Sequence, residues 1–265
     1  MLGTHNDEID RLGLQHLVWR PWMFAAWRRA RITRGSRVLD IGAGPGFATA
    51  DLAEVVGPQG EVLGLERSGR FVAVARRRCA EREFANARIE EVDLMVEGIP
   101  AASFDAAWCR WVACFVSSPT SLVQEIARAL RPRGVAIFHE YGDYASWRLM
   151  PPRPAVDRFV GAVMASWRAT GGEPDVGLTL PTLLQQCGFE VRAIRPLVFT
   201  VGPEDFIWQW PSTFLRSGAE RLRELGQLSD ADVEAIVAEF ANAERDPSTV
   251  MMTPLVLEII AQRCS

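Results

Sequence analysis

The chain has 265 residues, a formal net charge of −4 at pH 7 and 48% hydrophobic residues. This length suits one α/β domain with additions, and the apolar content is enough for a full core. No run of 18 apolar residues exists, so we expect no membrane span. The pI near 5.6 argues against a nucleic-acid partner, because nucleic-acid enzymes usually carry a basic surface.

The cysteines and the N-terminus bear on the compartment. Residues 1–8 are polar and lack the apolar core of a signal peptide. The five cysteines have neither C-x-x-C spacing nor a nearby histidine, which indicates free, mostly buried thiols and no metal site. We therefore expect a cytoplasmic protein.

The first predicted element is helical and spans residues 7–30. Apolar residues such as Ile9, Leu12 and Trp19 precede Pro21, which should break or kink the helix. A second short helix would follow, and residues 1–30 would form a cover over the rest of the domain.

A glycine-rich turn follows the first predicted strand. The strand Val38–Ile41 contains Asp40 and runs into Gly42, Gly44 and Gly46, and good helix formers follow over residues 47–56. Glycines let a backbone approach a ligand closely, and the N-terminus of the next helix presents unpaired N–H groups. The turn could hold a polar or anionic part of a nucleotide-like ligand, although an ordinary strand-to-helix turn is the plainer alternative.

The glycine spacing separates two classes of cofactor. The dinucleotide fingerprint G-x-G-x-x-G would place its third glycine at Phe47, one residue beyond Gly46. This spacing disfavours a nicotinamide oxidoreductase. The pattern D-x-G-x-G-x-G from Asp40 to Gly46 resembles the first motif of class I S-adenosylmethionine-dependent methyltransferases.

Two further strands place acids at the same edge of the sheet. Glu66 ends the strand 61–66, with Ser68 as a helix cap behind it, and Asp93 ends the strand 88–93. An acid 20 residues after Gly46 can accept both ribose hydroxyls. The resemblance implies that Asp93 takes the exocyclic amine of adenine.

Strands and helices alternate five times between residues 37 and 141, which predicts a parallel sheet with helices on both faces. The fourth strand, 104–109, flows into Arg110 and Trp111. A helix capped by Ser118 leads to the fifth strand, 135–140. The resemblance implies a Rossmann-like α/β fold with seven strands in the order 3-2-1-4-5-7-6, the last strand antiparallel.

The pattern changes after Tyr141. Helices are expected at 155–170, 179–187 and within 203–245, where Ser229 and Asp232 form a capping pair, and strands are expected at 188–201 and 255–260. We interpret residues 1–265 as a single methyltransferase domain. Residues 145–188 and 203–250 would be its helical cap and substrate segments.

Candidate catalytic residues lie in the hexapeptide 139–144. It contains one of three histidines and both tyrosines of the chain, at the expected end of the fifth strand. His139 has a suitable unperturbed pKa for a general base, and Glu140 or Tyr144 could orient the acceptor. Tyr141 and Tyr144 could equally be half-buried packing residues.

The same segment resembles a group of small bacterial methyltransferases with a Glu-Tyr-x-x-Tyr-x-x-Trp stretch. That group also shows an N-terminal helix like residues 11–16 and a Trp-x-Trp-Pro segment like residues 208–211. The cofactor-binding candidates are Gln15, Asp40, Gly42, Gly44, Gly46, Glu66, Arg67, Asp93, Leu94 and Arg110. The substrate candidates are His16, Trp111, Tyr141, Trp147 and Trp208.

The resemblance implies S-adenosylmethionine-dependent methyl transfer to a small, apolar or aromatic acceptor, with oxygen or nitrogen favoured over carbon. S-adenosylhomocysteine would be the product, and the protein would be a monomer or homodimer without a nucleic-acid or membrane partner. Two alternatives stay open. One is an enzyme that binds S-adenosylmethionine for other chemistry, and the other is a protein or RNA methyltransferase.

Overall fold

The computed structural model describes residues 6–99 and 104–264, so residues 1–5 of the expected N-terminal cover lie outside it. Its main sheet contains β1 (Arg37–Ile41), β2 (Glu61–Glu66), β3 (Ala87–Glu91), β4 (Phe104–Arg110), β5 (Leu130–Asp143), β7 (Phe189–Leu197) and β10 (Leu255–Arg263). The spatial order is β3-β2-β1-β4-β5-β10-β7, which is 3-2-1-4-5-7-6 when only these strands are counted. β10 is antiparallel to β5 and β7, and the other pairs are parallel. The predicted Rossmann-like fold is confirmed.

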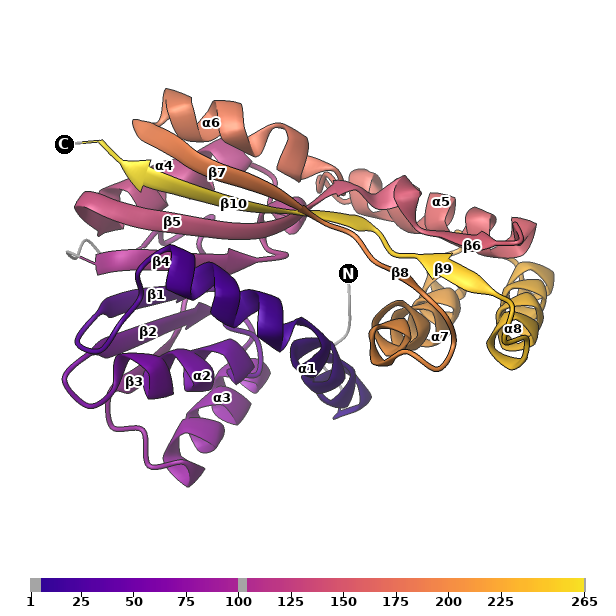
Figure 1. Cartoon of the computed structure of the whole chain (residues 1–265), viewed down its shortest axis with the longest axis horizontal. Helices are drawn as coiled ribbons and strands as arrows, with labels where there is room; N and C mark the ends of the chain where they lie inside the picture. The colour runs from indigo at the N-terminus through magenta and orange to yellow at the C-terminus, as the bar shows by residue number, and fades with distance from the viewer. Residues whose placement is uncertain (1–5, 100–103, 265) are drawn as a thin grey trace.

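Helices cover both faces of this sheet (Figure 1). One face carries α1 (Asn6–Arg29), α2 (Phe47–Val56) and α3 (Gly69–Glu81), and the other carries α4 (Pro119–Ala129) and α6 (Leu180–Gln186). Strand residues alternate between the two: Val38 packs with α1 and α2, whereas Leu39 and Ile41 pack in the cluster that includes α4. This alternation decides which helix layer each strand side chain contacts.

Beyond the main sheet lies a cap built from α5 (Pro154–Ala169), α7 (Gln209–Glu224), α8 (Asp230–Arg245) and a small antiparallel sheet (Figure 1). The small sheet has the order β6-β9-β8, formed by β6 (Arg148–Met150), β8 (Thr200–Val201) and β9 (Val250–Met252). Two- and three-residue strands are too short to show alternation, so the sequence predicted only the helices. That residues 1–265 form a single domain stays a prediction.

Four expected element boundaries were wrong. α1 runs through Pro21 as a single helix; the carbonyl that loses its partner belongs to Leu17, whose side chain lies on an exposed face where water can bond instead. β5 ends at Asp143 because β10 pairs with it as far as Leu255. β3 ends at Glu91, before Asp93. The expected strand 188–201 is divided between β7 and β8.

The predicted helix caps are confirmed. The side chains of Ser68 and Ser118 accept hydrogen bonds from the first turns of α3 and α4, and Ser229 forms a capping box with Asp232. None of the described helices combines the length and apolarity needed to cross a membrane.

Candidate active site

A cavity of about 160 Å³ lies at the carboxyl edge of the main sheet, between α1, the glycine turn and the cap. One side of its lining comes from α1, the end of β1, the glycine turn, the start of α2, and β4: Arg11, Leu12, Gln15, Asp40, Ile41, Gly42, Ala43, Gly44, Pro45, Phe47, Ala48, Trp108 and Arg110. The other side is largely aromatic: Trp111, Phe115, Tyr141, Tyr144, Trp147, Trp167, Trp210, Pro211, Phe214 and Pro254. We call this second set the aromatic chamber.

The three glycines of the turn have different structural roles. All have positive φ, at +65° for Gly42, +55° for Gly44 and +78° for Gly46. A Cβ on Gly42 would lie 2.3 Å from Val112, and one on Gly46 would lie 2.6 Å from Ala75, so both glycines allow close packing within the protein. A Cβ on Gly44 would meet nothing within 4 Å. Gly44 is therefore the position left open toward a ligand.

Glu66 holds the turn from the neighbouring strand. Its carboxylate accepts hydrogen bonds from the backbone N–H groups of Gly44 at 3.0 Å and Ser68 at 2.8 Å. Further along the same edge, Asp93 accepts from the N–H of Met95. Glu66 and Asp93 are absent from the cavity lining of the described residues, as are the remaining cofactor candidates Gly46, Arg67 and Leu94.

The side chains of Asp40 and Arg110 both line the cavity beside the glycine turn, without an ion pair between them. Asp40 accepts a hydrogen bond from the hydroxyl of Thr49 at 2.5 Å, and burial raises the pKa of Asp40 to about 7. Burial lowers the pKa of Arg110 to about 10, although Asp40 counteracts this shift. The Arg110 side chain donates to the sulfur of Met23 at 2.9 Å, and no described carboxylate lies within 4 Å of it. The pair can thus bind a group that carries both charges.

α1 closes the cavity with a buried polar cluster. Arg11 pairs with Glu8 through two hydrogen bonds of 2.7 Å and donates to Gln15 at 2.9 Å. Its guanidinium also lies over the ring of Phe214, 5.6 Å from the centroid, which links α1 to α7 of the cap. Arg11 was not among the predicted site residues, although its spacing to Glu8 and Gln15 on one helix face could have revealed it.

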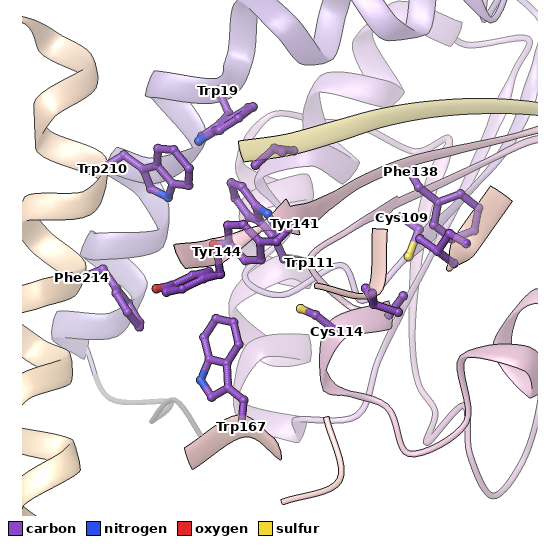
Figure 2. Close-up of a cluster of buried hydrophobic side chains, with 14 of the residues drawn as sticks. Trp19, Cys109, Trp111, Cys114, Phe138, Tyr141, Tyr144, Trp167, Trp210 and Phe214 are labelled. Atoms are coloured by element: carbon purple, nitrogen blue, oxygen red, sulfur yellow. The ribbon is translucent and has the colours of Figure 1, made fainter. Parts of the chain in front are cut away.

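The aromatic chamber is built on Trp111. Its ring lies 5.6 Å from Tyr141 at an interplanar angle of 19°, and 5.6 Å from Trp210 at 17°. Tyr141 and Trp210 are themselves parallel within 3°, and Trp19 meets both Trp111 and Trp210 edge-on. Figure 2 shows these rings together with Tyr144, Trp167 and Phe214. Three rings of common orientation suit a flat ligand.

The two tyrosine hydroxyls make no side-chain hydrogen bond within the described residues. Burial raises the pKa of both Tyr141 and Tyr144 well above the usual range, so both stay protonated. They can donate to a ligand but cannot act as bases near neutral pH.

Residues 39–138, which run from within β1 to within β5 and include the glycine turn, match the family model described as a methyltransferase domain. The chain therefore contains a methyltransferase domain of the class I S-adenosylmethionine-dependent type. It is 25% identical over 218 residues to the demethylmenaquinone methyltransferase of Anoxybacillus flavithermus, an alignment that covers 74% of this chain and 88% of that protein.

Solved structures share the fold of this methyltransferase. The Haemonchus contortus phosphoethanolamine N-methyltransferase 2, in complex with S-adenosylhomocysteine, matches with a TM-score of 0.59 and 17% identity, over 100% of this chain and 61% of that one. The [4+2]-cyclase SpnF matches with a TM-score of 0.57 and 21% identity, over 92% and 81%. One fold thus serves more than one chemistry.

His139, the candidate general base, lies away from the cavity. It is fully buried inside β5, packs edge-on to Trp19 and Trp108, and lies 3.5 Å from Glu258. Burial lowers its pKa. The sequence placed His139 at the end of the strand, but the strand continues for four more residues, so its ring has no access to an acceptor.

Glu140 is also buried away from the cavity lining, and its carboxylate faces the backbone of residues 112 and 113. Tyr144, the third catalytic candidate, does line the cavity.

Two substrate candidates also lie outside the cavity lining of the described residues. His16 contacts Asp51 at 3.1 Å and stacks on Phe47, which fastens α1 to α2. Trp208 donates to Glu244 and packs on Phe240, between the cap helices. Trp111, Tyr141 and Trp147 do line the cavity, and their role in substrate binding stays a prediction.

The sequence did not place Trp210, Phe214 or Trp167 among the substrate candidates, although all three line the cavity. In the Trp-x-Trp-Pro segment it singled out Trp208, but residues two apart on a helix face nearly opposite sides. Trp210 and Phe214 are four apart and share the face that points into the chamber. That spacing was the available signal.

Proposed function

We propose that this methyltransferase transfers a methyl group to oxygen or nitrogen of a small, flat, apolar or aromatic acceptor. The observation that carries the proposal is the aromatic chamber, which adjoins the glycine turn within one cavity. A chamber of buried side chains suits a small molecule better than an extended RNA or polypeptide. The relatives named for demethylmenaquinone and phosphoethanolamine support a small-molecule acceptor.

The cofactor would lie along the edge formed by β1, β2 and β3. Gly44 offers an open backbone to it, Glu66 has acceptor capacity left for the ribose hydroxyls, and Asp93 follows β3 for the adenine. The amino-acid tail carries an ammonium and a carboxylate. Asp40 matches the first charge and Arg110 the second, which explains why Arg110 needs no carboxylate partner within the described protein.

The acceptor would lie in the aromatic chamber. Bound S-adenosylmethionine supplies an activated methyl group, so the protein mainly has to align the acceptor atom. The hydroxyls of Tyr141 and Tyr144 can donate to the acceptor and orient its lone pair. No histidine is among the described lining residues, which favours an amine or an acidic phenol, since neither needs a strong protein base.

The test is an assay of S-adenosylhomocysteine release from purified protein and S-adenosylmethionine, across naphthols, hydroxyquinones, aromatic amines and aliphatic alcohols. We expect turnover with the flat phenols or amines and none with aliphatic alcohols. Turnover confined to aliphatic acceptors would refute the proposal. Mass spectrometry of the product assigns the methylated atom.

A second candidate is an enzyme that binds the cofactor but catalyses another reaction. The likeness to the [4+2]-cyclase SpnF and the lack of a histidine in the described cavity lining favour it. The discriminating measurement is stoichiometry: methyl transfer yields one S-adenosylhomocysteine for each product, whereas the second candidate converts its substrate while S-adenosylmethionine stays intact.

A further inference from the structure

We infer that Glu140 is a positioning residue: its carboxylate holds the turn after β4, and through this turn it sets Trp111 in the aromatic chamber and supports the glycine turn. The inference about the free protein stands by itself. Its consequence for cofactor affinity rests on the proposed cofactor site.

The contact is made by one oxygen of a fully buried side chain. Oε1 of Glu140 accepts hydrogen bonds from the backbone N–H groups of Val112 and Ala113, both at 2.8 Å. These groups begin a short 3₁₀ turn, η1 (Ala113–Phe115), and would otherwise be buried or partly buried donors without a partner. A charged acceptor makes such bonds stronger than a neutral one would.

The turn held by Glu140 is strained at the preceding residue. Trp111 has φ = +51°, in the left-handed region that is unfavourable for a bulky side chain. Its own N–H donates to the carbonyl of His139 at 3.0 Å. Two adjacent residues of β5 therefore hold the backbone around Trp111. The carbonyl of His139 binds the N–H of Trp111 itself, and the carboxylate of Glu140 binds the two N–H groups that follow. Such strain persists only where the surroundings enforce it.

The same turn touches both halves of the site. Val112 packs against the Cα of Gly42, where even a methyl group would come within 2.3 Å. Trp111 stacks on Tyr141 and Trp210 in the chamber. Release of the turn would therefore move the aromatic wall and loosen the support of the glycine turn together.

The carboxylate of Glu140 lies in the protein interior and outside the cavity lining of the described residues. Oε2 is buried and has no hydrogen-bond partner, and Glu140 is absent from the described cavity lining. Buried neighbours include the thiols of Cys109, 4.0 Å from Oε1, and Cys114. Burial raises the pKa of Glu140 to about 7, while the N–H groups of Val112 and Ala113 oppose the shift.

The test compares Glu140→Leu with Glu140→Gln. Leucine has a similar volume but no acceptor, whereas glutamine keeps a carbonyl oxygen for both N–H groups. The protein is labelled with 5-fluorotryptophan, and the ¹⁹F resonance of Trp111 is assigned by its loss in Trp111→Phe. We expect Glu140→Leu to shift or split this resonance. We also expect it to weaken the binding of S-adenosylhomocysteine, measured by calorimetry, at least tenfold. Glu140→Gln should stay within threefold of wild type with the resonance in place.

Glu258→Leu is the matched control, because Glu258 is equally buried, on β10 beside β5, but binds Arg29 instead of this turn. It should lower the melting temperature and leave the Trp111 resonance unchanged. If folded Glu140→Leu keeps both the resonance and the affinity, Glu140 has no positioning role. If Glu140→Leu does not fold, Glu140→Asp withdraws the carboxylate by one methylene and provides the same readouts. A shifted resonance with unchanged affinity would refute the proposed cofactor placement and keep the role of Glu140.

Discussion

Arg110 donates a hydrogen bond to the thioether sulfur of Met23, 2.9 Å away, in place of the carboxylate that a buried guanidinium usually binds. This contact points the side chain toward α1, beside Asp40 and the glycine turn. Arg110 also lies over the ring of Trp111, and since its one described hydrogen-bond partner is a weak acceptor, it keeps N–H donors available for an anion. The carboxylate of the cofactor is the anion that this position would meet.

Arg110→Met should weaken the binding of S-adenosylhomocysteine about 10- to 100-fold, because the charge-assisted hydrogen bonds between Arg110 and the ligand carboxylate are lost. The affinity for 5′-methylthioadenosine, which lacks the amino-acid tail, should be almost unchanged. Calorimetry with both ligands makes the comparison. An equal loss for both would show that Arg110 supports the fold of the site and does not bind the carboxylate. Arg20→Met, on α1 beside Asp51, is the control and should spare both affinities.

Glu66→Ala should weaken the binding of S-adenosylhomocysteine by about 2–3 kcal/mol, since the ribose hydroxyls lose a charged acceptor. The N–H of Gly44 loses its partner as well, which adds to the effect. Glu61→Ala, at the other end of β2, removes a half-buried carboxylate of the same strand and should leave the affinity unchanged. Unaltered binding by Glu66→Ala would remove Glu66 from the site.

Gly44→Ala should fold and fail to bind the cofactor. Its Cβ meets no protein atom within 4 Å, so the stability loss is limited to about 1–2 kcal/mol from the positive φ. Circular dichroism and thermal unfolding check the fold, and calorimetry with S-adenosylhomocysteine checks binding. Retained affinity would mean that the ligand approaches the turn elsewhere. Gly42→Ala, in contrast, should destabilise the fold itself, because its Cβ would clash with Val112.

The resemblance and the strand pattern predicted the fold well, and the site only in part. The acids and glycines of β1 and β2 could be placed because their positions are fixed relative to strand ends. His139 could not, since the length of β5 depends on antiparallel pairing with β10, more than 100 residues later in the chain. Likewise, the facing of Trp208 and Trp210 depends on where α7 begins. Both errors come from tertiary context that local pattern does not contain.

The pH dependence of stability should reveal the buried Asp40. Its folded pKa is raised from 3.8 to about 7, so the folded state binds a proton more tightly than the unfolded state between these values. This contribution is present below pH 4 and is lost as the pH rises toward 7. Asp40→Asn should therefore unfold with a free energy that exceeds that of wild type increasingly from pH 4 to pH 8. Parallel pH profiles for the two proteins would contradict the raised pKa.

Trp208 and Trp210 of the cap should respond differently to substitution by leucine. Trp210 lies in the chamber beside Trp111, whereas Trp208 packs between α7 and α8. With an acceptor found by the S-adenosylhomocysteine assay, Trp210→Leu should raise the apparent Michaelis constant about tenfold or more, because an aromatic face in contact with the acceptor is lost. Trp208→Leu should lower the melting temperature and leave that constant within about threefold, since only packing inside the cap changes. A larger kinetic effect of Trp208→Leu, or none of Trp210→Leu, would mean that the acceptor binds outside the chamber, and the assignment of the aromatic wall would then have to be abandoned.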